Sequence, residues 1–179
     1  IKLTKKKSVK IDENNDDKSE ESAEIGADTL MQLLGATGGP ESRSIMLQGN
    51  LEEENAADVV TALIVLSSQK NPETDEVDPI KFYISTYGGS ASEMFAVYDV
   101  VRSIRDLSPV RTFGIGKVMS AGVLVLASGT KGERRIGRHC RVMIHGVVSG
   151  QQGHIADVEN EFEEAKSTQK LYISALASE

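Results

Sequence analysis

Short apolar runs alternate with amphipathic stretches along most of the chain. Four of the runs have the length and apolar character of buried strands: 44–48, 80–84, 110–115 and 141–145. Between the first three runs, apolar residues recur every three or four positions, which predicts one helix through about Ser68 and another ending before Pro109. Successive strand-helix units favour a mostly parallel sheet with helices on its faces. The pattern therefore predicts an α/β fold.

Local signals indicate where these elements begin and end. Asn50, with Glu53 three residues later, is expected to cap the first helix. The pair Gly88-Gly89 is expected to break the second strand sharply. The segment 121–127 is apolar on every side, so we expect a fully buried helix that opens at Ser120.

A long helix is predicted from about Ile155 to the end of the chain, after an extended, glycine-bearing segment at 146–153. Its apolar residues step by threes and fours and form one stripe: Ile155, Val158, Phe162, Ala165, Tyr172 and Leu176. The helix follows the last predicted strand. It could therefore project and pair with another subunit, or pack on its own domain, and the sequence leaves both open.

The first 24 residues differ in composition from the rest of the chain. Lysines dominate 2–10 and acidic residues dominate 12–24, a composition that cannot bury a core. We expect a solvated, disordered tail, or else an arm that orders on assembly. The chain is therefore divided into a charged amino-terminal tail at 1–24 and one globular domain at 25–179.

Composition narrows the classes of function. The chain has 179 residues, enough for one core, and a net charge of -7, which opposes general binding to nucleic acid or anionic membranes. No apolar stretch approaches the length of a membrane span. Cys140 is the only cysteine, so no intrachain disulfide can form, and a cytoplasmic location is expected. Because the first residue is Ile1 and not methionine, we expect a processed product or a chain trimmed from a longer product.

Two segments carry a candidate nucleophile and a candidate base. Ser120 follows the third strand and precedes the apolar helix, and a serine at such a junction can expose its hydroxyl beside an unpaired backbone N–H. His145 ends the fourth strand, and active sites assemble at the ends of parallel strands. A capping serine and a structural histidine are the alternatives. His139 and His154 lie in polar, glycine-flanked stretches and are expected at the surface.

Backbone donors for a tetrahedral oxyanion are also available. Gly89, at the end of the second strand, and Ala121, directly after Ser120, could each present an N–H group to it. A turn that needs a positive φ is the other explanation of the glycine pair Gly88-Gly89.

Several other kinds of site are disfavoured. Val118 occupies the first glycine position of the α/β-hydrolase elbow, and it also stands where a P-loop needs serine or threonine. Met119 stands where the dinucleotide fingerprint needs its third glycine. No two histidines have the spacing of metal ligands on a helix, so no histidine-based metal site is predicted.

Taken in order, these motifs resemble the family of Clp protease proteolytic subunits (ClpP), over about residues 30–179. The segments that carry the resemblance are Arg43-x-Ile45-x-Leu47-x-Gly49, Tyr83-Ile84-x-x-x-Gly88-Gly89, Tyr98-Asp99, Gly116-x-x-x-Ser120-x-Gly122, Gly129-x-Lys131-Gly132-x-Arg134 and Arg141-Val-Met-Ile-His145. Each glycine motif alone is weak, but the ordered combination is specific.

The resemblance implies a ClpP/crotonase-type α/β fold of repeated strand-strand-helix units with a projecting strand-helix handle. It implies a serine endopeptidase in which Ser120 is the nucleophile and His145 the general base, with Gly89 and Ala121 at the oxyanion hole. Residues 150–153 match the strand that borders the substrate groove. The long final helix matches the handle, and the chain ends within it.

The resemblance also implies partners. Family members form homo-oligomers of stacked heptameric rings that enclose a chamber, and a separate ATP-dependent unfoldase delivers unfolded polypeptides to it. The subunit itself needs no cofactor, because only the unfoldase uses ATP.

The chain departs from the family pattern in three places, the first being that the family's amino-terminal axial segment is not recognisable in residues 1–24. Gly146-Val147 replaces the usual Gln-Pro after the histidine, and the aspartate of the triad is expected beyond the handle helix. Asp157 starts that helix, so it is interpreted as a helix-initiating residue. Two alternatives to a peptidase stay open: a non-catalytic ring subunit and, ranked lower, a crotonase-type acyl-CoA enzyme with the same fold and backbone oxyanion pair.

Overall fold

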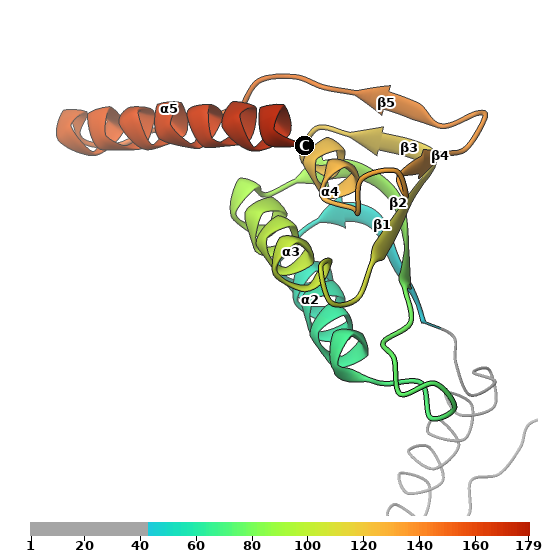
Figure 1. Ribbon diagram of the computed structural model, residues 1–179. Helices are drawn as coiled ribbons and strands as arrows, with labels where there is room; N and C mark the ends of the chain where they lie inside the picture. The colour runs from blue at the N-terminus through green and yellow to red at the C-terminus, as the bar shows by residue number, and fades with distance from the viewer. Residues whose placement is uncertain (1–42) are drawn as a thin grey trace, which may run out of the picture. The chain divides into compact units, whose positions relative to one another are not determined.

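The computed structural model of the protein describes residues 43–179 (Figure 1). The chain divides into two compact units, 1–42 and 43–179, and the description below concerns the second. The charged tail predicted at 1–24 and the start of the predicted globular domain lie outside the described residues.

Five parallel strands form one sheet. β1 (Ser44–Leu51), β2 (Ile80–Gly89) and β3 (Val110–Met119) pair in this order. The far edge of β3 pairs with two short strands in succession, β4 (Arg135–Ile136) and β5 (Arg141–Met143). The sequence did not predict β4, because two residues are too few to produce an apolar pattern.

A helix follows each of the three long strands: α2 (Glu53–Ser68), α3 (Ala91–Ile104) and α4 (Ala121–Ala127). The predicted α/β fold with a parallel sheet is confirmed, with one difference. Burial alternates along the strands, so that Leu47 and Phe82 are fully buried while Met46 and Lys81 are exposed. Within residues 43–179 the helices therefore cover one face of the sheet and not both, as Figure 1 shows.

The core lies between that covered face and the three helices. Its fully buried large side chains come from strands and helices alike: Leu47, Leu51, Leu63, Ile80, Phe82, Ile84, Val97, Val101, Val110, Val118, Leu124 and Val125. α4 has no exposed residue, as predicted for an apolar helix. It approaches β2 closely because Gly122 faces the Thr86 methyl, where a Cβ atom would collide. The core therefore fixes α4, and with it the residue that opens α4.

One of the predicted boundaries was wrong. Asn50 does not cap α2; it belongs to β1 and pairs with Gly88, because a register shift after Gly49 carries the strand further. The cap is Glu52, whose N–H donates to Asn55 Oδ1 at 2.9 Å. β2 does end at the pair Gly88-Gly89, as predicted, although both glycines are still paired with β1.

The fourth predicted strand is shorter than expected. β5 ends at Met143, so His145 lies two residues beyond it. Residues 150–153, which the family resemblance matches to a strand beside the substrate groove, form no strand with any described residue. A strand needs a neighbour for its backbone groups, and residues 43–179 place none beside this segment.

α5 (Ile155–Ser178) combines the two placements that the sequence left open. Its first half projects from the body of the domain, where Ile155 is 79% and Phe162 61% exposed (Figure 1). Its last turns pack on the body through Tyr172, which is buried, and Leu176. Asp157 lies in its first turn, as interpreted from the sequence. No helix within residues 43–179 is long and apolar enough to cross a membrane.

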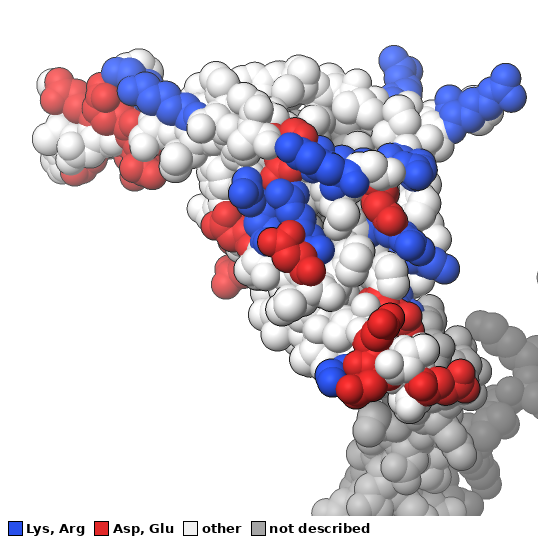
Figure 2. All heavy atoms as spheres, viewed as in Figure 1, with Lys and Arg blue, Asp and Glu red and all other residues white. Residues whose placement is uncertain are grey.

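An ion-pair cluster fixes the end of α5 to the body. The Glu179 carboxylate lies 2.7 Å from Arg134, 2.9 Å from Arg105 and 3.3 Å from Arg102. Burial alone would raise the pKa of Glu179, but the hydrogen bonds and charges of Arg105 and Arg134 outweigh it and hold the pKa below its ordinary value. Figure 2 shows basic side chains gathered in the region of α3 and α4, beside the end of α5.

Candidate active site

The four site residues expected from the sequence lie around one cavity of about 320 Å³. It opens where β2 and β3 end and α3 and α4 begin, the edge at which parallel sheets assemble their sites. The segment after β5 and the end of α5 close the other side. The lining residues are Gly89, Ser90, Ala91, Met94, Ser120, Ala121, His145, Gly146, Val147, Val148 and Tyr172.

Ser120 occupies the junction of β3 and α4 in a strained backbone conformation. Its φ is 53° and its ψ is -124°, values that a residue with a side chain rarely adopts. The N–H of Ser120 donates to the carbonyl of Met143 at 2.8 Å, which ties the turn to β5. Its hydroxyl makes no capping hydrogen bond, so helix capping does not explain the serine. The Ser120 side chain lines the cavity, and a strained serine turn of this kind also occurs in acyl-transfer enzymes.

The two glycines of β2 are required by close packing. Gly88 has a φ of 93°, and a Cβ atom on it would lie 2.6 Å from Ser120 Cβ and 2.8 Å from the carbonyl oxygen of Met119. A Cβ atom on Gly89 would collide with the carbonyl group of Leu51. The positive-φ explanation therefore holds for Gly88, whose missing side chain lets β2 reach the Ser120 turn. The missing side chain of Gly89 lets β2 lie against Leu51 of β1.

Backbone donors lie at the same edge. Ala121 is the first residue of α4, so its N–H has no helical partner four residues earlier. Gly89 lines the cavity from the end of β2. An anionic oxygen formed beside Ser120 would meet this edge of the cavity, which is the arrangement that acyl transfer needs.

His145 reaches the cavity from the exposed segment after β5. Its Nδ1 lies 2.5 Å from the carbonyl oxygen of Gly146. A carbonyl can only accept, so Nδ1–H donates in this contact and the neutral ring keeps its lone pair on Nε2, as a general base requires. No hydrogen bond joins Ser120 to His145 among the described residues. Catalytic hydrogen bonds are often loose before substrate binds, so the missing hydrogen bond is compatible with Ser120 and His145 acting as a catalytic pair.

Sequence reasoning missed the apolar side of the cavity. Met94 and Tyr172 both line the cavity, and of the two only Tyr172 was named from the sequence, as a member of a helical stripe. Tyr172 is buried, and its hydroxyl donates to the backbone carbonyl of Ser120 at 3.3 Å. Burial raises the pKa of Tyr172, so the hydroxyl remains a donor at neutral pH. The helical period identifies a buried face but not which buried residue reaches a site.

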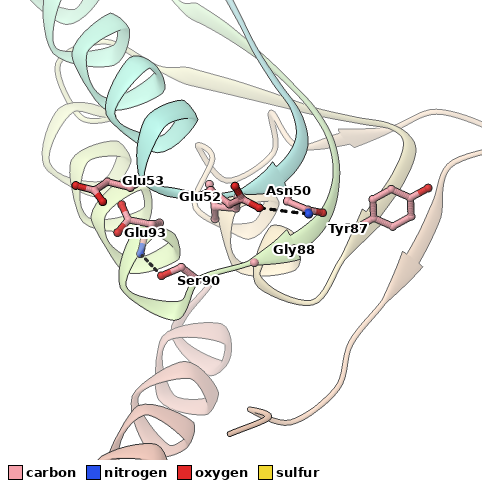
Figure 3. Close-up of a pocket in the computed structure, with 9 residues that line it drawn as sticks. Asn50, Glu52, Glu53, Tyr87, Gly88, Ser90 and Glu93 are labelled. Carbon is pink, nitrogen blue, oxygen red and sulfur yellow. Dashed lines mark hydrogen bonds between the residues drawn. The ribbon is translucent and has the colours of Figure 1, made fainter. Parts of the chain in front are cut away.

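A second cavity, of about 540 Å³, adjoins the first across Gly89 and Ser90 (Figure 3). Its acidic residues, Glu52, Glu53 and Glu93, cap α2 or lie in the first turns of α2 and α3. Negative charge at the amino end of a helix stabilises the helix dipole, which accounts for these carboxylates without a ligand.

His139 and His154 are exposed, as predicted, and neither lines the cavity. The site therefore draws on one of the three histidines. Cys140 is partly buried against Gly114, and burial raises the pKa of its thiol, which disfavours the reactive thiolate.

Comparisons with known proteins agree with this geometry. The family model described as Clp protease matches residues 37–179. The ATP-dependent Clp protease proteolytic subunit 2 of Treponema pallidum (strain Nichols) is 35% identical over 139 residues, which cover 78% of this chain and 66% of that protein. The chain thus spans slightly less than two thirds of the length of that relative. The match to the family model covers most of the chain, including every residue of the cavity, and the chain belongs to the Clp protease family.

Proposed function

We propose that the chain is a serine endopeptidase subunit of a Clp-type chambered protease that hydrolyses unfolded polypeptides. The observation that carries the proposal is the meeting of Gly89, Ser120, Ala121 and His145 around one cavity. The strained backbone of Ser120 supports it, because strain at a side chain that faces a cavity is typical of a reactive residue.

The proposed reaction proceeds through an acyl-enzyme. Ser120 Oγ attacks the peptide carbonyl while His145 takes its proton, and the N–H groups of Gly89 and Ala121 stabilise the oxyanion. The C–N bond then breaks as His145 returns the proton to the leaving amine. Water, deprotonated by His145, attacks the ester and releases the carboxylic acid with Ser120 regenerated. The triad's carboxylate is expected downstream of α5, as inferred from the family resemblance.

We also propose the assembly that such a site needs. Homo-oligomeric, stacked heptameric rings in the cytoplasm would enclose the Ser120 cavities, and a separate ATP-dependent unfoldase would feed them. The exposed apolar residues of α5, including Ile155 and Phe162, support subunit pairing, because exposed apolar side chains on one helix favour burial against a partner. Native mass measurement of the full-length protein tests this, and a monomer at micromolar concentration would contradict it.

A non-catalytic ring subunit is the second candidate. The lack of a hydrogen bond between Ser120 and His145 among the described residues favours it, because a structural subunit does not need the two side chains to be joined. Ser120 and its strained turn favour the peptidase, since a structural subunit does not need a strained serine.

A fluorophosphonate probe distinguishes the two. Such a probe reacts with an activated serine hydroxyl, so the full-length assembled protein should be labelled, and Ser120→Ala should abolish the labelling. The His145→Ala variant should slow labelling by several orders of magnitude, because general-base assistance and positioning act together at such sites. Wild-type protein that assembles but takes up no label at Ser120 would favour the non-catalytic subunit.

A further inference from the structure

Two residues of α5 contact the two halves of the candidate site. Tyr172 donates its hydroxyl to the backbone carbonyl of Ser120 at 3.3 Å. Gln169 accepts a hydrogen bond from the backbone N–H of Val147, two residues after His145, at 2.5 Å. The two residues are three positions apart on α5 and so share one face of the helix. One helical turn therefore bonds to both the nucleophile turn and the segment of the base.

The segment of the base has few other constraints. β5 ends at Met143, and the side chains of Ile144 and His145 are exposed. Beyond the sheet, the backbone of this segment is anchored to another element at Val147, through Gln169. A side chain on Gly146 would also meet Gln169, at 3.1 Å from its Oε1 atom. The place of His145 relative to the cavity therefore depends on α5 as well as on β5.

The nucleophile turn is held on its other side. Its N–H donates to Met143 of β5, and its carbonyl accepts from Val123 at 2.9 Å as well as from Tyr172. Three hydrogen bonds and two chain segments thus form a closed ring. It runs from Ser120 to Met143, along the chain to Val147, across to Gln169, along α5 to Tyr172 and back to Ser120. Such a ring restricts the distance between the two ends of the catalytic pair.

We propose that Gln169 and Tyr172 are positioning residues that set the spacing of Ser120 and His145. This inference rests on the proposed peptidase function. Neither residue transfers a proton. Tyr172 acts through the backbone of the nucleophile and Gln169 through the backbone beside the base.

The test separates each hydrogen bond from packing. Tyr172→Phe removes the hydroxyl and keeps the buried ring. Gln169→Leu removes the acceptor and keeps the approximate size, whereas Gln169→Glu keeps an acceptor oxygen for Val147. Steady-state hydrolysis of a fluorogenic peptide and the rate of fluorophosphonate labelling are measured on the full-length assembled protein. Native mass and thermal unfolding are measured alongside.

We expect Tyr172→Phe and Gln169→Leu each to lower kcat about tenfold with KM nearly unchanged, because misplacement of reacting groups affects the chemical step. Gln169→Glu should retain most of the activity. Two matched controls, Tyr83→Phe and Gln48→Ala, alter residues that do not line the cavity and should behave as wild type.

The outcomes distinguish the two proposals. If Ser120→Ala abolishes labelling but Tyr172→Phe and Gln169→Leu keep the wild-type kcat, the positioning role is wrong and the peptidase stands. Equal losses in Gln169→Leu and Gln169→Glu would also contradict the role of the acceptor oxygen. If Ser120→Ala keeps full activity, the peptidase proposal fails and the positioning role fails with it. For a variant whose native mass shows partial dissociation, labelling is compared on the fraction that remains assembled.

Discussion

Gly88 of β2 lies against Ser120, so closely that a Cβ atom on the glycine would stand 2.6 Å from the Cβ atom of the serine. The same atom would lie 3.0 Å from the backbone nitrogen of Ala121. Non-bonded carbon atoms normally approach to about 3.5–4.0 Å. The glycine therefore fixes both the nucleophile turn and one of the proposed oxyanion donors.

The first prediction is that Gly88→Ala disrupts the site. The new methyl group would displace the Ser120 turn, so labelling by a fluorophosphonate should fall at least as far as for loss of one oxyanion donor, about 10²–10³-fold. Gly49→Ala is the matched control. Gly49 has a similar φ, 89° against 93° for Gly88, but a Cβ atom on it would meet nothing within 4 Å. Both variants share the backbone strain, and only Gly88→Ala adds the collision. Equal labelling of the two would contradict the packing argument.

The second prediction concerns the strain at Ser120. Glycine tolerates the positive φ of this residue and alanine does not, so Ser120→Gly should be more stable to unfolding than Ser120→Ala by about 1–2 kcal/mol. Both variants lack the hydroxyl and should be inactive. At Ser167, an exposed residue in the middle of α5, the order should reverse, because glycine is less favourable than alanine in a helix interior by about 1 kcal/mol. Denaturant unfolding measures both differences. An unstrained serine would give the same order at the two sites.

Much of the fold could be predicted because its causes are local. The apolar segment 121–127 and the stripe of α3 follow from helical periodicity, and the parallel order follows from the alternation of strands and helices. The strand boundaries could not be predicted so closely. Asn50 is a residue type that often caps helices, yet a register shift in the pairing with β2 extends β1 through it. Pairing between strands cannot be read from a local sequence pattern.

The candidate site, like the fold, could be predicted only where its features are local in the sequence. Ser120 and His145 could be proposed from their places at strand ends, and the glycine pair from its chemistry. The dependence of the site on Gln169 and Tyr172 could not, because each contact joins residues more than 20 positions apart along the chain. A stripe on α5 identifies residues that pack, but only the three-dimensional structure shows that Tyr172 packs against the nucleophile.

The third prediction tests how α4 is held on the sheet. Gly122→Ala should destabilise the protein, because its methyl group would collide with the Thr86 side-chain methyl. Overpacking of this kind costs about 1–3 kcal/mol. Thr86→Ser removes that methyl and keeps the hydroxyl, which accepts a hydrogen bond from Gly88 N–H at 2.9 Å.

The double variant Gly122→Ala with Thr86→Ser should therefore recover most of the lost stability. A double-mutant cycle in denaturant unfolding gives the coupling between the two positions. Coupling near zero would show that the two side chains do not compete for space and that α4 is placed in some other way.

The fourth prediction concerns pH and the end of α5. Arg105 and Arg134 hold the pKa of Glu179 below its ordinary value near 4.5. Ionisation of this carboxylate therefore stabilises the folded state relative to the unfolded state. The stabilisation is then fully present above that ordinary value and is lost as the pH falls through the lower pKa of the folded state. Glu179→Gln in the full-length protein should lower stability at pH 7 by about 1–3 kcal/mol, the usual range for hydrogen bonds to charged groups. The gap to wild type should narrow below about pH 4.5.

Glu163→Gln is the matched control for that experiment. Glu163 pairs with Lys166 at 2.7 Å, but both side chains are largely exposed, and such pairs contribute about 0–1 kcal/mol. The Glu163→Gln control should therefore have the stability of the wild type both at pH 7 and below about pH 4.5. Thermal unfolding across pH 3–8 measures all three proteins. A Glu179→Gln deficit that stays constant across this range would mean that the carboxylate charge does not hold α5, and that its last turns are fixed by the packing of Tyr172 and Leu176.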